Sequence, residues 1–142
     1  MKENRKIISF VTLIVCLLMF FTSCVSNNDE TDLWKDALYT QDTIVGDGEK
    51  TLYIEVKTPK KSITLTILTD KETVGEALSE HNLIDGENGA YGLYVKKVNN
   101  ILADYDINQT YWSFTKDGEY LSSGVDITKF SSNDKFELVY TK

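Results

Sequence analysis

Residues 63–81, which read ITLTILTDKETVGEALSEH, change their hydrophobic period part-way along. Apolar residues alternate with polar ones from 63 to 67, which is the pattern of a half-buried β-strand. From Thr73 the sequence has the Thr-x-x-Glu form of a capping box, which marks the start of a helix. Four residues then recur at the spacing of one helix face: Val74, Ala77, Leu78 and His81. The segment therefore predicts a strand followed by one amphipathic helix.

Further alternating segments flank this unit. Residues 52–57 (LYIEVK) predict a strand that forms a hairpin with the strand at 63–67, and residues 85–89 (DGENG) predict a loop after the helix. Candidate strands follow at 93–98, 111–115, 119–121 and 136–141, with a tight Asp-Gly turn at 117–118. This order predicts an α+β fold, in which a β-grasp-like mixed sheet is packed by one amphipathic helix.

The first 24 residues have the organisation of a secretory signal. Cations near the start precede an apolar run over 7–21, and two small residues stand before Cys24. The run is shorter than the roughly 20 residues that span a bilayer. Its end resembles the bacterial lipobox, in which signal peptidase II cuts before a lipid-modified cysteine. An ordinary secretory signal and an uncleaved anchor are the alternatives.

The expected division of the chain follows from this cleavage point. Residues 1–23 are the lipoprotein signal peptide, 24–50 the lipidated cysteine and a tether, and 51–142 the folded domain. Acyl chains on Cys24, palmitate among them, would anchor the protein at the extracytoplasmic face of the cell membrane. The other cysteine, Cys16, lies in the apolar run, so the mature chain would contain no intrachain disulfide.

The charge of the chain argues against one class of partner. The formal net charge is −7 at pH 7, and the cations of the expected domain form no cluster. Binding to nucleic acid depends mainly on cations that neutralise phosphates. We therefore expect no nucleic-acid partner.

A set of segments in the expected domain resembles one bacterial family. The segments are 73–78 (TVGEAL), 91–99 (YGLYVKKVN), 103–105 (ADY), 111–114 (YWSF), 124–126 (GVD) and 133–140 (NDKFELVY). They resemble the transcobalamin-like C-terminal domain family (domain of unknown function 4430) over about residues 50–142. That family is similar to the β-domain of vitamin B12 carriers, which closes over cobalamin held against a separate helical domain. The resemblance implies ligand binding, with cobalamin as a candidate ligand and a transporter or surface protein as a candidate partner.

Aromatic residues are the candidate contacts for such a ligand. Tyr111 and Trp112 are adjacent on a predicted strand, so their side chains face opposite sides of the sheet. Trp112 shares its phase with Phe114, which predicts Trp112 in the core and Tyr111 at the surface. The resemblance places a ligand-binding face on six residues: Tyr91, Tyr94, Tyr111, Trp112, Val125 and Asp126. The alternative is that most of these rings fill the core.

No catalytic or metal constellation is expected, and hence no enzyme. His81, the single histidine, lies at the core-facing phase of the helix and is interpreted as a partly buried helix residue. The segment from Asp104 opens like a calcium loop, but Gln109 stands where that loop needs glycine. No cysteine of the mature chain is available as a zinc ligand, because Cys24 is expected to carry the lipid.

Two functions remain open on the sequence. The first is non-catalytic binding of cobalamin or a similar soluble ligand by a surface lipoprotein of an uptake system. The second is an interaction module that docks to another protein or to the cell wall and binds no small molecule. An open sheet edge suits the second function, because a partner can add a strand to it.

Overall fold

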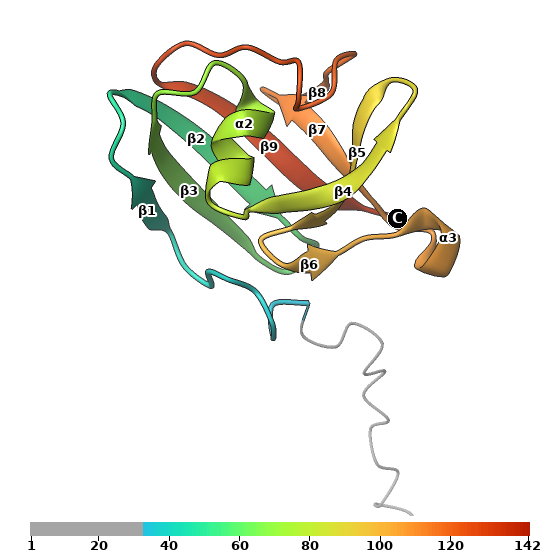
Figure 1. Cartoon of the computed structure of the whole chain (residues 1–142). Coiled ribbons are helices and arrows are strands. Elements are labelled where there is room, and N and C mark those ends of the chain that lie inside the picture. The colour runs from blue at the N-terminus through green and yellow to red at the C-terminus, as the bar shows by residue number, and fades with distance from the viewer. Residues whose placement is uncertain (1–32) are drawn as a thin grey trace, which may run out of the picture. The chain divides into compact units, whose positions relative to one another are not determined.

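The computed structural model describes residues 33–142, shown in colour in Figure 1. Cys24 and the expected signal peptide lie outside the described residues. The larger of two sheets has the strand order β1-β3-β2-β9-β7-β8. Its strands are β1 (Thr43–Gly46), β2 (Lys50–Lys57), β3 (Ser62–Thr69), β7 (Tyr111–Lys116), β8 (Glu119–Tyr120) and β9 (Asp134–Thr141).

The larger sheet is mixed, as predicted. β2 and β3 form an antiparallel hairpin, and β9 runs parallel to β2 and antiparallel to β7. The alternation read from the sequence is confirmed in β2 and β3, where every second side chain is buried: Leu52, Ile54, Val56, Ile63, Leu65 and Ile67. These side chains form the central part of the core.

The predicted helix is α2 (Val74–Glu80), which crosses one face of the larger sheet in Figure 1. Its capping box is confirmed: the Thr73 hydroxyl accepts from Glu76 N over 3.3 Å, and Thr73 N donates to the Glu76 carboxylate over 3.1 Å. The helix ends with His81 as its C-cap, and Asn82 follows with a positive φ of 54°. A second helix, α3 (Tyr105–Asn108), forms a single short turn.

The expectation of one sheet and of a loop at 85–89 is wrong. A second, three-stranded sheet contains β4 (Ile84–Gly89), β5 (Gly92–Val98) and β6 (Ile101–Leu102) in that order. Residues 87–89 form the polar end of β4, where they pair with β5 beyond the core and are exposed. No buried face exists there, so the sequence shows no alternation that could predict a strand.

The boundary of the expected tether at residue 50 also differs from the structure. Residues 33–142 form one compact unit, and β1 pairs in parallel with β3 inside the span assigned to the tether. Trp34 is buried, with 8% of its surface exposed. The buried Asn99 side chain bonds both backbone groups of Tyr39, to N over 3.0 Å and O over 2.7 Å. The segment therefore belongs to the domain from residue 33.

The described residues contain no helix with the length and apolar character to cross a bilayer.

Candidate functional site

A pocket of about 300 Å³ lies where β5, β7 and the segment after β8 meet. We call it the aromatic pocket. Its lining combines six aromatic rings and several aliphatic side chains with hydroxyls and a glycine: Tyr91, Leu93, Tyr94, Val95, Tyr111, Trp112, Ser113, Phe114, Tyr120, Leu121, Ser122, Ser123, Gly124, Val125 and Leu138. None of these residues carries a charged side chain at neutral pH.

The pocket brings together five of the six residues that the sequence singled out. Tyr91, Tyr94, Tyr111, Trp112 and Val125 all line it. The first two come from β5 and its preceding turn, the next two from β7, and Val125 from the loop before β9. Asp126, the sixth, follows Val125 but does not line the pocket. Residues distant in sequence therefore converge on one concave surface.

Exposure differs strongly among these rings. Trp112 is 7% exposed, and its indole Nε1 donates to Ile101 O over 3.2 Å, so it is a core residue with little surface open to the pocket. Its ring also meets Tyr140 edge-on, with centroids 5.5 Å apart. Tyr91 is 97% exposed and stands at the tip of the β4–β5 hairpin. The pocket thus has a rigid inner side and an exposed outer rim.

Tyr111 lies between these extremes, half-buried in the pocket wall. Partial burial raises the pKa of its phenol, and the neighbouring Tyr120 and Tyr105 hydroxyls raise that pKa further. The Tyr111 phenol therefore stays protonated at neutral pH. It can donate one hydrogen bond to a ligand and accept others.

The sequence interpretation missed Tyr120 and the serines that follow it. Tyr120 pairs with Thr115 across the Asp117-Gly118 turn, and Leu121 N donates to Phe114 O over 3.1 Å. The Asp117-Gly118 turn could have predicted their position, because a two-residue turn fixes the register of the strands that it joins. Extending that register past residue 120 places 121–123 beside β7.

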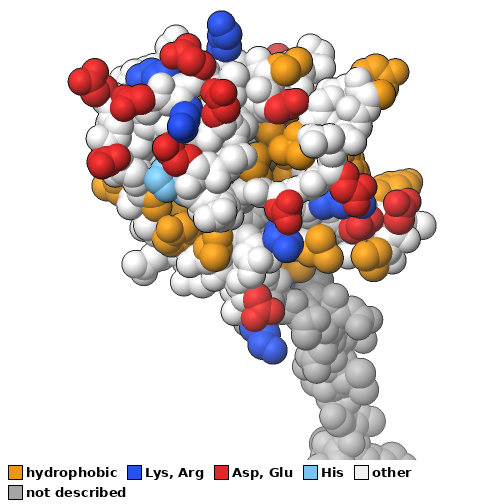
Figure 2. Space-filling model, in the orientation of Figure 1, with side chains coloured by type: hydrophobic (Ala, Val, Ile, Leu, Met, Phe, Trp, Pro, Cys, Tyr) orange, Lys and Arg blue, Asp and Glu red, His pale blue; other side chains and the backbone are white. Residues whose placement is uncertain are grey.

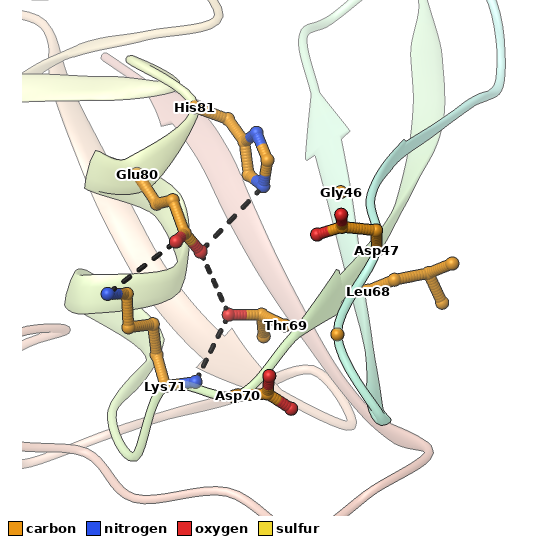
Figure 3. A pocket seen from close by; sticks show the side chains of 9 residues that line it. Gly46, Asp47, Leu68, Thr69, Asp70, Lys71, Glu80 and His81 are labelled. Atoms are coloured by element: carbon orange, nitrogen blue, oxygen red, sulfur yellow. Dashed lines mark hydrogen bonds and ion pairs between the residues drawn. The ribbon is translucent and has the colours of Figure 1, made fainter.

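A second pocket, of about 320 Å³, lies at the C-terminal end of α2 (Figure 3). Glu80 is central to it, where its carboxylate accepts from Thr69 Oγ1 over 3.1 Å and lies 3.5 Å from Lys71 Nζ. The side chain of His81 is 21% exposed, in agreement with the predicted partial burial, and its Nε2 is 4.0 Å from Glu80. Within residues 33–142 no group of three or more His, Cys, Asp and Glu side chains is placed to hold a metal ion.

Charged side chains on the face in Figure 2 are mixed in sign. Lys96 Nζ lies 2.9 Å from Glu87 and 3.2 Å from Asp104, and these partners raise the pKa of Lys96. Lys116 Nζ is 3.0 Å from Asp134. The lysines nearest the aromatic pocket in sequence are therefore already paired with carboxylates.

The fold and the pocket define a small mixed-sheet domain with an aromatic concavity. The chain belongs to the family described as Domain of unknown function (DUF4430), whose profile matches residues 71–142. The family expected from the sequence is thereby confirmed at that level.

Solved structures provide further comparisons. A candidate metal-binding protein from Ruminococcus gnavus ATCC 29149, with a crystal structure at 1.30 Å, is 36% identical with a TM-score of 0.62. The alignment covers 66% of this chain and 98% of that one. Haptocorrin in complex with Cbi aligns with a TM-score of 0.49 and 15% identity, over 69% of this chain and 27% of that chain. No curated protein sequence matches significantly.

Proposed function

We propose that this protein is a membrane-anchored surface lipoprotein whose domain binds a small molecule in the aromatic pocket without catalysing a reaction. The convergence of Tyr91, Tyr94, Tyr111 and Trp112 on one concavity carries the proposal. Small-molecule sites are concave and largely apolar, with a few placed polar groups, and the aromatic pocket has this composition.

The lining favours a neutral ligand with a flat apolar face and hydrogen-bonding groups at its edge. Tyrosine rings supply stacking surface, while Ser122, Ser123 and the Tyr111 phenol supply donors and acceptors. A corrinoid such as cobalamin has these properties. The resemblance of the family to the β-domain of cobalamin carriers supports a corrinoid as the first ligand to test.

The volume of the pocket limits how tightly such a ligand can bind alone. About 300 Å³ is at the lower end of the range for small-molecule sites, so a large flat ligand would be covered on one face only. Association has a fixed entropic cost that a small contact area recovers poorly. We therefore expect binding in the micromolar range by this domain, with a partner protein covering the other face.

Calorimetry tests the ligand. Cobalamin and cobinamide are titrated into the soluble 25–142 fragment, with Ca²⁺ and Zn²⁺ in parallel because the Ruminococcus gnavus relative is a candidate metal binder. Saturable heat with a corrinoid, lost in a Tyr111→Ala variant, supports the proposal. Absence of corrinoid heat at high micromolar concentration contradicts it.

The lipid anchor has its own support and its own test. The apolar run over 7–21 and the small residues before Cys24 motivate it. Labelled palmitate fed to expressing cells should enter the full chain and be absent from a Cys24→Ser variant. Equal labelling of both chains, or of neither, contradicts the anchor.

A second candidate function is docking to another surface protein. Strand β7 pairs with β8 only at Thr115 and Lys116, so Tyr111–Ser113 have a strand partner only on the β9 side among the described residues. A free edge of this kind accepts an added strand. Partners cross-linked from solubilised membranes by the wild-type domain, and not by a domain N-methylated at the Trp112 amide, would favour this function, because that N–H faces away from β9.

A further inference from the structure

Two separate segments contribute to the walls of the aromatic pocket. The β4–β5 hairpin supplies Tyr91, Leu93 and Tyr94, and the segment at 120–125 supplies another wall. Residues 87–91, at the tip of the hairpin, are all exposed. The width of the pocket therefore depends on what holds the hairpin to the 120–125 segment.

One hydrogen bond makes that connection. The Oδ2 atom of Asp126 accepts from Leu93 N over 3.2 Å. Within the part of the chain that the structure describes, it is the hydrogen bond that joins residues 86–94 to residues 120–128. Asp126 itself does not line the pocket, so it acts on the pocket through the hairpin.

Two glycines make room for this carboxylate. A Cβ atom at Gly92 would lie 2.5 Å from Asp126 Oδ2, and one at Gly124 would lie 2.7 Å from Asp126 Oδ1. Gly92 also has a φ of +104°, which other residues rarely adopt. A Cβ at either glycine would therefore displace the Asp126 carboxylate from its position beside the hairpin.

The backbone of Asp126 is fixed from the other side by α2. Gly75 N donates to Val125 O over 2.8 Å, and Val74 N donates to Thr128 O over 2.9 Å. The Thr128 hydroxyl closes the turn through a bond of 2.7 Å to Gly124 O. Because the turn is held by the helix, the exposed hairpin is the partner that can move.

The carboxylate is only half satisfied. Its Oδ1 atom is buried and has no hydrogen-bond partner, whereas Oδ2 bonds Leu93 N. A buried acceptor without a partner loses its hydration and gains nothing in return, and a charged group loses more. The closed hairpin is therefore stabilised by the bond from Leu93 N to Asp126 Oδ2 and destabilised by the burial of the unpaired Oδ1.

We infer that Asp126 is a positioning residue that fastens the β4–β5 hairpin as a movable wall of the aromatic pocket. Its unpaired Oδ1 keeps the closed state of the hairpin close in free energy to an open state. Opening would hydrate the carboxylate and release Leu93, which widens the pocket on the side of Tyr91. The part of this inference that concerns ligand entry rests on the proposed function, whereas the fastening does not.

Hydrogen–deuterium exchange of the full chain in detergent tests the fastening without a ligand. Exchange is read for peptides covering 86–95 and, as an internal reference, 52–57 in β2. Asp126→Ala removes the acceptor of Leu93 N and should speed exchange in 86–95 by about fivefold or more while the reference stays unchanged. Asp126→Asn keeps an acceptor for Leu93 N, so it should speed exchange there less than Asp126→Ala does.

The matched control is Asp70→Asn, since Asp70 Oδ1 also accepts a backbone amide, that of Glu49, over 2.9 Å. It should leave 86–95 unchanged. Unchanged exchange in Asp126→Ala would overturn the inference. So would a parallel rise in the reference peptide, or an opening in Asp126→Asn equal to that in Asp126→Ala.

Association kinetics with cobinamide test ligand entry. Asp126→Ala should raise the association rate constant, because it releases the hairpin, and an unchanged or lower rate constant would overturn the gating role. If the wild-type chain binds no corrinoid, the proposed ligand fails, and with it the gating of that ligand. The exchange measurement still decides whether Asp126 fastens the hairpin.

Discussion

The indole Nε1 of Trp34 donates a hydrogen bond to Thr58 Oγ1 over 3.0 Å, and Lys61 Nζ lies 4.8 Å from the centroid of the same ring. Trp34 thus fastens the first described segment to the turn between β2 and β3. The Thr58 hydroxyl in turn donates to Lys61 O over 3.0 Å. The start of the domain and this turn therefore stabilise each other.

Replacing Trp34 tests this arrangement. Trp34→Ala should lower the free energy of unfolding by about 3 kcal/mol, since it removes a buried aromatic side chain. Trp34→Phe keeps most of the apolar surface and loses the hydrogen bond, so its cost should be near 1 kcal/mol. Urea unfolding followed by circular dichroism measures both. Equal stability of Trp34→Ala and the wild type would mean that residues 33–42 do not belong to the folded unit.

Glu55 should make stability depend on pH. Its carboxylate lies 2.8 Å from Lys135 Nζ and accepts from Ser62 Oγ over 2.8 Å. The bond with Lys135, more than any other contact, holds the pKa of Glu55 below its ordinary value of 4.5. The unfolded chain therefore binds the proton more readily. The stabilisation is complete above about pH 4.5 and is lost as the pH falls through the lower pKa of the folded state.

A Glu55→Gln variant should accordingly be less stable than the wild type by about 1 kcal/mol at pH 7. The difference should shrink as the pH is lowered from 7 to 3, because Glu55 then becomes protonated in both states. Urea midpoints at the two pH values measure it. Glu119→Gln is the control, because Glu119 is exposed and forms no ion pair among residues 33–142. A difference for Glu55→Gln that stays constant with pH would contradict this assignment.

A pair of glycines separates backbone strain from the fit around Asp126. Gly92 and Gly118 both have positive φ values, of 104° and 79°. A Cβ at Gly118 meets nothing within 4 Å, whereas one at Gly92 collides with the Asp126 carboxylate. Gly118→Ala should therefore cost about 1 kcal/mol from φ alone. Gly92→Ala should cost more, and only Gly92→Ala should speed exchange in 86–95. Equal losses of stability in the two variants would show that the Asp126 carboxylate moves aside without cost.

The phenol of Tyr111 should ionise at a higher pH than an ordinary tyrosine. Its pKa is raised above the ordinary value of 10.0 by partial burial and by the neighbouring Tyr120 and Tyr105. Ultraviolet titration of the wild type minus Tyr111→Phe should isolate one phenol that ionises above pH 10. In a Tyr120→Phe background the same difference should shift to lower pH. A Tyr111 phenol that titrates below its ordinary value would contradict the described pocket wall.

Ligand affinity should follow the rings of the pocket. Tyr111→Ala removes stacking surface and a hydrogen-bond donor, which should weaken corrinoid binding about tenfold, equivalent to about 1.4 kcal/mol. Tyr53 is a suitable comparison, because it lies on β2 and does not line the pocket. Calorimetry of both alanine variants measures the difference. An equal loss in Tyr53→Ala would place the binding elsewhere.

Local patterns predicted the central hairpin and the helix because each depends on its own residues. β2 and β3 each bury one face, and α2 carries its own capping box, so period and spacing suffice. β1 could not be predicted in this way. Its pairing with β3 is parallel and spans about 20 residues of chain, and its four residues contain no buried side chain that would produce a pattern.

The candidate site shows the same division. Tyr91, Tyr94, Tyr111, Trp112 and Val125 came from the family resemblance, and the structure gathers them in one pocket. Asp126 came with them as a contact residue, but its carboxylate bonds the hairpin instead. The difference arises because a side-chain bond to the backbone of Leu93, 33 residues away, leaves no periodic signal in the sequence.

The residue at which the folded unit begins determines the maximum distance between the domain and a lipid anchor. With Cys24 lipidated as we propose, only residues 25–32 separate the lipid from a domain that is fastened at Trp34. A linker of this length spans about 30 Å at most, whereas a tether that extends to residue 50 would span about 85 Å. The shorter linker would restrict the domain to a thinner layer above the bilayer. Its effective concentration toward a membrane-embedded partner would therefore be higher.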